Sequence, residues 1–322
     1  MARLIRNPIV ERVLFRIKDV TDWTVAKLVN LVIHLLKKLP PDTSTNVAEW
    51  TMRRIGFLFP RNKLARSNIA LAFPEKSDAE VEEILKGMWG HVGRTIAEYI
   101  FLDELFDYDY WGGDPGRIDA HGVDEFVRIY QKGGGRMVMF TAHMGNWEML
   151  PIAAATYDVN VTALFRPPNN KYIAKRVLKA RTTSMGHLVP SKAGAAWALA
   201  RVLEEDGAVG VLVDQHFTKG PEVEFFGRTA RANPLVARLA RRYDCPVYPA
   251  RCVRLPGGKF RMDLFDPLEL PRDDDGLIDV NASTQMINSI VEDWVREYPQ
   301  QWLWIHDRWK DKKKKKRKRS AS

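Results

Sequence analysis

The sequence predicts an α/β protein with an open, mainly parallel sheet flanked by helices and with a helical N-terminal extension. Two patterns lead to this prediction. Apolar runs of strand length lie near residues 136–141, 159–165, 187–190, 208–214, 246–254 and 259–265. Helical patterns lie between several of these runs, at 147–157, 171–185, 191–206 and 233–244. Strands that alternate with helices in this way are typical of parallel sheets covered by helices.

Two further features complete the predicted core. Pro256-Gly257-Gly258 separates the last two strands and predicts an antiparallel hairpin there. A final helix is expected from about Val280 to Glu297. We therefore expect one α/β domain with a helical subdomain at 46–309, preceded by a separate N-terminal region at 1–45 and followed by a basic tail at 310–322.

The charge and the cysteine content of the chain limit the partners that it can bind and the kinds of site that it can form. The chain of 322 residues carries a net charge of +10, which indicates an anionic partner: a nucleic acid, a membrane surface or an acidic protein. Its two cysteines, Cys245 and Cys252, form no CxxC pattern, which argues against structural zinc and fits a reducing compartment. Ordinary core positions are the simplest interpretation of both thiols.

The N-terminal region contains the most apolar stretch, residues 20–39. Polar residues recur every three or four positions and form one narrow stripe on a helix: Lys27, Asn30, His34, Lys37 and Lys38. The lysines interrupt the run too often for a membrane-spanning helix or a signal peptide. Two interpretations stay open, an amphipathic helix lying in the bilayer interface and a helix docked on the protein's own core.

A helical subdomain is expected next. Residues 61–72 begin a helical region that ends at Phe73-Pro74. Ser77, followed by Glu80 three residues later, has the spacing of a capping box and predicts a long helix to about Tyr99.

The stretch from Phe140 to Glu148, Phe-Thr-Ala-His-Met-Gly-Asn-Trp-Glu, joins a predicted buried strand to a predicted helix. This places His143 at the carboxyl end of a strand, where open α/β sheets bind ligands. Asn146 is a suitable N-cap, and a turn at Gly145-Asn146 would bring Glu148 back onto the imidazole. A carboxylate on one ring nitrogen fixes the tautomer and raises the basicity of the other, which makes a general base. The alternative is a capped helix with a surface histidine and a solvated glutamate.

Other candidate residues follow later strands. Arg166, before Pro167-Pro168, closes the second strand on the same rim as His143, and its guanidinium suits a phosphate. Asp214 and Gln215 end the fourth strand, where they could also simply cap a turn. Phe225 and Phe226 are candidates for either a cleft or the core, and Arg228 follows them where a polar headgroup could meet it.

The whole string His-Met-Gly-Asn-Trp-Glu resembles the signature of the lysophospholipid acyltransferase superfamily, and Gly-Asn-Trp-Glu resembles its lipid A late acyltransferase branch. Further matches are the segment at 68–75, Arg166, the Asp214-Gln215 and Phe225-Phe226-Gly227 pair, and the aromatic segment at 298–310. Aromatic density in that last segment fits interfacial anchoring or core, and we interpret His306 as structural. The resemblance covers roughly residues 45–310.

The resemblance implies transfer of a fatty acyl group from an acyl carrier protein thioester to a hydroxyl of a lipid A precursor, with no cofactor or metal. His143 and Glu148 would be catalytic, while Asn146, Arg166, Asp214, Gln215 and Arg228 would bind substrate. Family members work at the cytoplasmic face of the bacterial inner membrane, so the expected partners are the acidic carrier protein, the anionic glycolipid and the membrane surface, and no nucleic acid.

Other functions stay open. The acceptor could be another glycolipid such as a phosphatidylinositol mannoside. The same His-Glu pair could act on water in a thioesterase-like hydrolase. A non-catalytic membrane or nucleic-acid binder would rely on the basic run that ends at Arg319.

Overall fold

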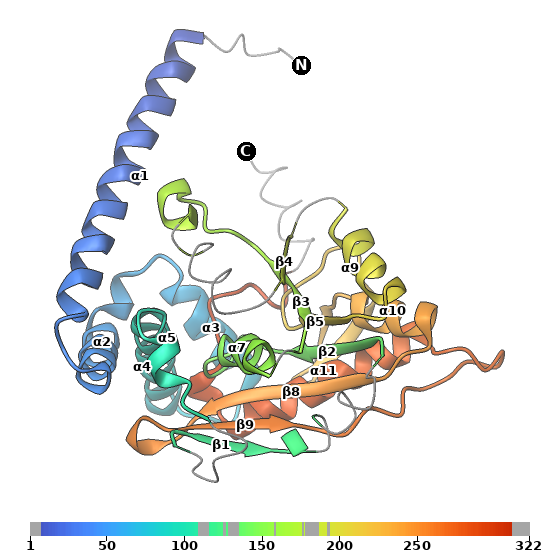
Figure 1. Ribbon diagram of the computed structural model, residues 1–322. Coiled ribbons are helices and arrows are strands. Elements are labelled where there is room, and N and C mark those ends of the chain that lie inside the picture. The colour runs from blue at the N-terminus through green and yellow to red at the C-terminus, as the bar shows by residue number, and fades with distance from the viewer. Residues whose placement is uncertain are drawn as a thin grey trace, which may run out of the picture.

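The computed structural model describes residues 8–108, 116–124, 127, 135–157, 159–175, 177, 187–191 and 194–310. Within them a seven-stranded sheet has the order β1-β9-β8-β2-β5-β3-β4. Its strands are β1 (Ile118–His121), β2 (Met137–Thr141), β3 (Val161–Phe165), β4 (His187–Pro190), β5 (Ala208–Leu212), β8 (Val247–Arg254) and β9 (Phe260–Leu264). All neighbouring pairs are parallel except β8 and β9, which are antiparallel. The predicted fold class and the predicted hairpin are confirmed (Figure 1).

Helices cover this sheet and extend from it. Those of the N-terminal part are α1 (Pro8–Leu36), α2 (Pro41–Ile55), α3 (Asn62–Ala72), α4 (Asp78–Glu98) and α5 (Leu102–Leu105). Those of the α/β part are α7 (Met149–Thr156), α9 (Ala195–Glu204), α10 (Leu235–Tyr243) and α11 (Val280–Glu297). A separate two-stranded antiparallel sheet consists of β6 (Glu222–Phe225) and β7 (Arg228–Arg231). The predicted helix over 171–185 lies partly outside the described residues.

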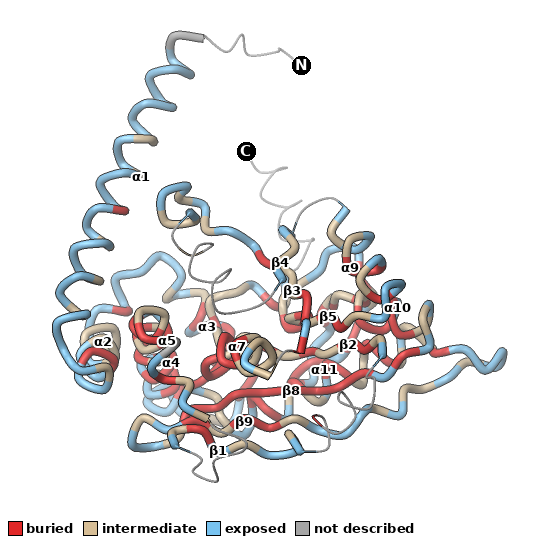
Figure 2. Tube along the Cα trace, viewed as in Figure 1, coloured by how far each residue is buried: buried red, intermediate tan, exposed pale blue. Residues whose placement is uncertain are grey.

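The buried core lies between the sheet and its helices. Leu199, Val211 and Val236 are among its fully buried members, and β8 is buried along its whole length (Figure 2). The long helix α4 packs on α2 and begins at Ser77 with the predicted capping box: the Ser77 hydroxyl accepts from Glu80 N–H, and Glu80 accepts from Ser77 N–H. Both cysteines are buried and unpaired, as the simplest interpretation predicted.

Helix α1 differs from the rest of the molecule. It projects from the body, and most of its apolar side chains are exposed (Figures 1 and 2). The second interpretation of this helix, docking on the protein's own core, is therefore wrong: Ala26 is the one buried apolar residue on the described part of α1. Among the described helices, none combines the length with the apolar character that crossing a bilayer requires.

Candidate active site

Strands β2 and β5 bring His143 and Asp214 together. The two strands are parallel neighbours with Thr141 paired to Leu212, and Val213 N–H donates to the Thr141 carbonyl at 3.1 Å. Each chain then runs two residues past the paired position, so His143 and Asp214 leave the carboxyl edge of the sheet side by side. Nδ1 of His143 lies 2.7 Å from Oδ1 of Asp214, and the His143 backbone N–H donates to Oδ2 at 2.9 Å.

The Asp214 carboxylate is buried and held from several directions. Trp302 Nε1–H also donates to Oδ2, at 2.8 Å. Burial alone raises the pKa of Asp214, but the charge and hydrogen bonds of His143, together with the Trp302 bond, outweigh it and lower this pKa below its usual range. Asp214 is therefore ionised and accepts a proton of His143 Nδ1, which leaves Nε2 as the ring nitrogen that can accept a proton.

This geometry adds a carboxylate to the predicted pair of His143 and Glu148. The carboxylate at hydrogen-bonding distance from Nδ1 of His143 is that of Asp214, which the sequence analysis placed among the substrate-binding residues. Glu148 is 2 % exposed, and its Oε1 accepts from Trp147 Nε1 at 2.8 Å. Trp147 in turn packs edge-on against the His143 ring, with centroids 5.2 Å apart.

The loop that carries His143 is fixed by the C-terminal segment. Leu303 N–H donates to the His143 carbonyl at 3.0 Å, and Gly145 N–H donates to the Gln301 carbonyl at 3.0 Å. Gly145 has φ +54°, and a Cβ there would lie 1.9 Å from the Cys252 carbonyl oxygen of β8. Only glycine fits a left-handed residue pressed this closely against another backbone.

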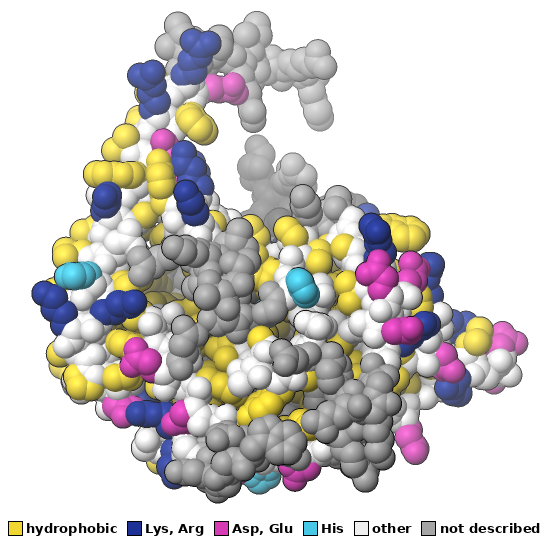
Figure 3. Space-filling view, viewed as in Figure 1, with side chains coloured by type: hydrophobic (Ala, Val, Ile, Leu, Met, Phe, Trp, Pro, Cys, Tyr) yellow, Lys and Arg dark blue, Asp and Glu magenta, His cyan; other side chains and the backbone are white. Residues whose placement is uncertain are grey.

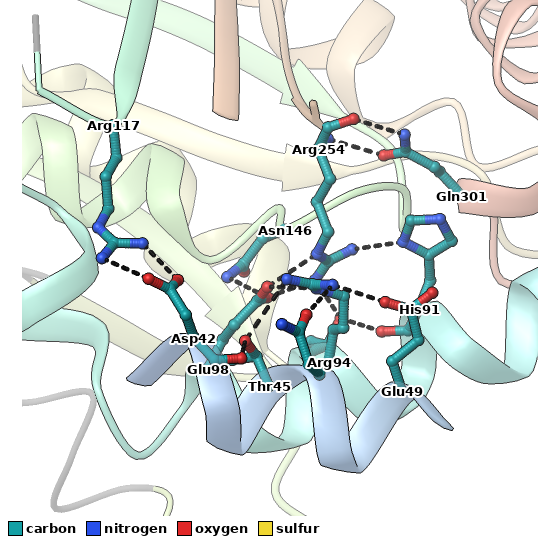
Figure 4. A network of polar contacts seen from close by, with 12 residues as sticks. Asp42, Thr45, Glu49, His91, Arg94, Glu98, Arg117, Asn146, Arg254 and Gln301 are labelled. Carbon is teal, nitrogen blue, oxygen red and sulfur yellow. Dashed lines mark hydrogen bonds and ion pairs between the residues drawn. The ribbon is translucent and has the colours of Figure 1, made fainter. Parts of the chain in front are cut away.

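Asn146 anchors the loop to a buried polar network. Its Nδ2 donates to Glu98 Oε2 at 2.9 Å, and Glu98 is paired with Arg254 (Figure 4). The Asn146 side chain is not the N-cap of α7 as predicted, because that helix begins at Met149 and its N-cap is Glu148. The Asn146 oxygen instead accepts from Glu148 N–H at 3.2 Å, which closes the turn before the helix.

The same network contains a second histidine, which is not part of the candidate site. His91 Nδ1 lies 3.3 Å from Arg254 Nη1. Burial and the neighbouring arginines, Arg254, Arg94 and Arg53, lower the pKa of His91 to about 2. His91 is therefore neutral and accepts a hydrogen bond from Arg254. The network joins α2, α4, β8 and the His143 loop (Figure 4).

Gln215 lies next to Nε2 of His143, and His306 lies next to Gln215. Gln215 Nε2 is 3.3 Å from His143 Nε2 and 3.2 Å from His306 Nε2, and the two imidazole centroids are 5.8 Å apart. The sequence interpretation gave His306 a structural role and did not consider Trp302. Both lie in the aromatic C-terminal segment, so its close match to the family pattern was the signal that could have identified them.

An apolar cavity lies beside this site and is lined in part by α7. Its lining includes Trp147 and Glu148 of the His143 loop, together with residues of β2, β3 and β5. Apolar side chains make up nearly all of the lining, among them Met139, Ile118, Val161, Leu188, Leu212 and Met262. A cavity of this composition suits a hydrocarbon chain.

The remaining predicted residues occupy different surroundings. Arg166 is exposed just past β3, on the carboxyl rim as expected, and Arg228 is exposed at the start of β7, on the two-stranded sheet. Phe225 and Phe226 are both buried, in contact with Trp302 and Trp304 respectively, so both are core residues. The aromatic density at the C-terminal end is likewise mostly core, since Trp302 and Trp304 are buried.

In the part of the chain that the structure describes, no group of three or more histidine, cysteine or acidic side chains could hold a metal ion. The basic run after Lys310 lies outside the described residues.

Comparisons with known proteins show which family this chain resembles. A family model described as bacterial lipid A biosynthesis acyltransferase matches residues 16–311. The lipid A biosynthesis palmitoleoyltransferase of Escherichia coli (strain K12) is 23% identical over 269 residues, which cover 80% of this chain and 81% of that relative. The lipid A biosynthesis acyltransferase of Shigella flexneri matches with the same identity and coverage.

Proposed function

The chain belongs to the bacterial lipid A biosynthesis acyltransferase family, and from this membership we propose that it moves a fatty acyl group from an acyl carrier protein thioester to a hydroxyl of a lipid A precursor. The family predicted from sequence motifs is confirmed, and with it an acyltransferase of lipid A biosynthesis. The donor, the acceptor and the catalytic residues are our proposal. The observation that carries it is the His143 imidazole, oriented by Asp214 beside an apolar cavity.

In the proposed reaction His143 is the general base. Nε2 of His143 takes the proton of the acceptor hydroxyl as its oxygen attacks the thioester carbonyl. The ionised Asp214 on Nδ1 stabilises the imidazolium that forms. When the tetrahedral intermediate collapses, the C–S bond breaks and the imidazolium returns the proton to the departing sulfur. The products are an ester and a free carrier thiol, and a thioester is activated enough that no covalent enzyme intermediate is needed.

The acyl chain would occupy the apolar cavity. Glu148 lines the cavity next to Trp147, which packs against the His143 ring, so it would flank the reacting carbonyl. We keep Glu148 as a proposed catalytic residue on this basis. Its contribution would come in addition to that of Asp214.

Charge that develops on the carbonyl oxygen needs donors. The backbone N–H groups near the start of α7 are one conceivable source. Those of Gly145, Glu148 and Met149 are already bonded to Gln301 and Asn146 oxygens. We therefore propose Arg166, exposed on the rim, for the oxyanion or for an acceptor phosphate.

We further propose that α1 lies on the membrane surface. Phe15, Trp23 and Leu28 are all about half exposed or more, and basic residues alternate with the apolar ones along the helix (Figure 3). Such a helix binds the boundary between headgroups and acyl chains. The proposed location is the cytoplasmic face of the bacterial inner membrane, where a carrier protein and a lipid precursor would meet the enzyme.

The net charge of +10 supports the two proposed substrates. An acyl carrier protein is acidic and a phosphorylated glycolipid is anionic, so both would be attracted to a basic enzyme. We propose neither a nucleic-acid partner nor a cofactor.

An acyl-transfer assay in detergent tests the proposal. Wild type, His143→Ala, Asp214→Asn and Glu148→Ala are compared on acyl carrier protein thioesters and a lipid A precursor, with His121→Ala as a control at an exposed histidine on β1. We expect no product from His143→Ala, a loss of about 10²–10⁴-fold for Asp214→Asn, a clear reduction for Glu148→Ala, and no change for the control.

The same assay separates the alternatives. Equal activity in wild type and His143→Ala would overturn the mechanism. Thioester loss without lipid product would identify a hydrolase. Transfer to a phosphatidylinositol mannoside but not to the lipid A precursor would keep the mechanism and change the acceptor.

A further inference from the structure

His306 is held beside the candidate base by contacts from the N-terminal helical region. Asn68, buried on α3, donates from Nδ2 to the His306 carbonyl at 2.6 Å and to the Trp304 carbonyl at 2.8 Å. Two bonds from one buried amide fix the backbone on which the imidazole is mounted. The backbone of His306 is therefore fixed, and the centroid of its ring lies 5.8 Å from that of His143.

The Gln215 amide joins the two histidines. Its Nε2 lies within hydrogen-bonding distance of both Nε2 atoms, at 3.3 Å from His143 and 3.2 Å from His306. A primary amide nitrogen carries two hydrogens and accepts none. It can serve both rings only if each presents an unprotonated Nε2, and for His143 this is the tautomer that the Nδ1–Asp214 bond selects.

Taking the proposed acyl transfer as the reaction, we propose that His306 is a positioning residue of this site. It accepts one N–H of the Gln215 amide and so keeps the other N–H on Nε2 of His143, which holds the base neutral with its lone pair on Nε2. The acceptor hydroxyl takes the place of that N–H when it binds. His143 then meets the hydroxyl ready to take its proton.

The amide can face His143 in either of two ways, and His306 selects between them. If the amide turns over, its oxygen faces Nε2 of His143 and favours a proton there. Because Nδ1 already shares a proton with Asp214, that proton makes His143 an imidazolium, which cannot act as a base. An unprotonated Nε2 on His306 opposes this turn, since it would lose its donor.

Four groups act on the charge of the His306 ring besides burial: His143, Asp214, Arg61 and Arg166. Burial lowers the pKa of His306, a protonated His143 would lower it, and Arg61 and Arg166 lower it too, against the opposite effect of Asp214. These groups keep His306 neutral and able to accept. Asp214 acts in the other direction on His143 by favouring the imidazolium, and the Gln215 N–H offsets this preference.

Two substitutions of similar size separate this role from simple packing. His306→Phe keeps a ring but offers no acceptor, whereas His306→Gln places an amide oxygen near the position of Nε2. In His306→Phe we expect the acid limb of the pH profile of kcat/KM to shift to higher pH by about one unit. At pH values on the acid side of this limb, kcat/KM should therefore fall about tenfold. The activity at high pH should be retained, and His306→Gln should follow the wild type.

Nitrogen NMR of protein labelled at its histidines measures the protonation of His143 directly, in the absence of substrate. The His143 signals, assigned from His143→Ala, should show a higher protonation midpoint in His306→Phe and in Gln215→Leu than in the wild type or in His306→Gln. An unchanged midpoint in His306→Phe, or equal loss of activity in both His306 variants at every pH, would overturn the inference. If even the wild type transfers no acyl group, the proposed function fails and the NMR midpoints alone decide the role of His306.

Discussion

The His143 loop and helix α1 use polar and apolar side chains in opposite ways. In the loop, Asn146 and Glu148 are buried and each is hydrogen bonded to a neighbouring side chain. On α1, apolar residues such as Phe15 and Leu28 are exposed. Burying polar groups costs free energy unless partners compensate, and exposing a continuous apolar face costs free energy unless something covers it.

This contrast shows which contacts hold the His143 loop and which contacts hold helix α1. Other parts of the chain fix the loop: it continues β2, lies against Cys252 of β8, and hydrogen bonds to Asp214 after β5 and to the C-terminal segment. The apolar face of α1 has no comparable cover within the described residues, and the body holds this helix through polar contacts such as Asn170 Nδ2 to the Asp22 carbonyl at 2.7 Å. Changes in the loop should therefore alter folding and chemistry, and changes on α1 should alter neither.

The largest effect is expected at the buried pair beneath the loop. Glu98→Gln removes the charge that compensates Arg254 while both groups stay buried, so the free energy of unfolding should fall by about 3–5 kcal/mol. The matched control is Glu83→Gln, whose ion pair with Arg53 is exposed and should contribute at most about 1 kcal/mol. Urea unfolding of both variants measures the difference, and equal losses would remove the distinction between buried and exposed pairs.

A smaller but more local effect is expected at Gly145. Gly145→Ala adds the left-handed penalty of about 1–2 kcal/mol and also places Cβ against the Cys252 carbonyl. The loop must shift, so acyl transfer should be lost even where the protein still folds. Gly276→Ala is the control, because Gly276 also has a positive φ but a Cβ there meets open space. If Gly276→Ala is as harmful as Gly145→Ala, the close approach to β8 is not the cause.

A pH-dependent effect is expected from His91. Its folded pKa of about 2 lies far below the usual value, so between these values the unfolded state binds a proton that the folded state does not. Stability should therefore rise with pH, and it should fall by about 1.4 kcal/mol for each unit below about pH 6.5. His91→Gln keeps an acceptor for Arg254 but does not titrate, so this part of the slope should disappear. Parallel stability curves for the two proteins between pH 4.5 and 8 would contradict the neutral state of His91.

Much of the fold could be predicted because hydrophobic periodicity and capping are local. The strand at 187–190, the helix at 280–297 and the Ser77 capping box are found as predicted. Other elements have weaker local signals. Strand β1 has only four residues and pairs with β9 far along the chain, and β6 and β7 form a short hairpin whose residues had been considered for a cleft.

The sequence predicted which residues belong to the candidate site better than it predicted the role of each. His143, Asp214 and Gln215 were all selected, because each follows an apolar strand and lies in a segment that resembles a family motif. Which carboxylate meets the imidazole depends on the order of strands in the sheet, and the sequence does not reveal that β2 and β5 are neighbours. The Asp214 contact spans 71 residues of sequence, so spacing within a single motif could not suggest it. His306 was assigned a structural role for the same reason, since it reaches the site only through tertiary pairing of 301–303 with the loop.

The smallest effect on folding is expected on α1. Leu28, Leu31 and Leu35 are more than half exposed, and replacing all three with glutamine keeps helix propensity while removing apolar surface. The free energy of unfolding in detergent-free buffer should change by no more than about 0.5 kcal/mol per site. Binding to vesicles that contain phosphatidylglycerol should nevertheless be lost, because each leucine contributes about 1.5–3 kcal/mol when it is buried. Asn30→Gln with His34→Gln, on the polar stripe, is the control and should keep vesicle binding. Unfolding at several kcal/mol less in the leucine variant would mean that this face packs on the protein itself, and the contrast between the two regions would disappear.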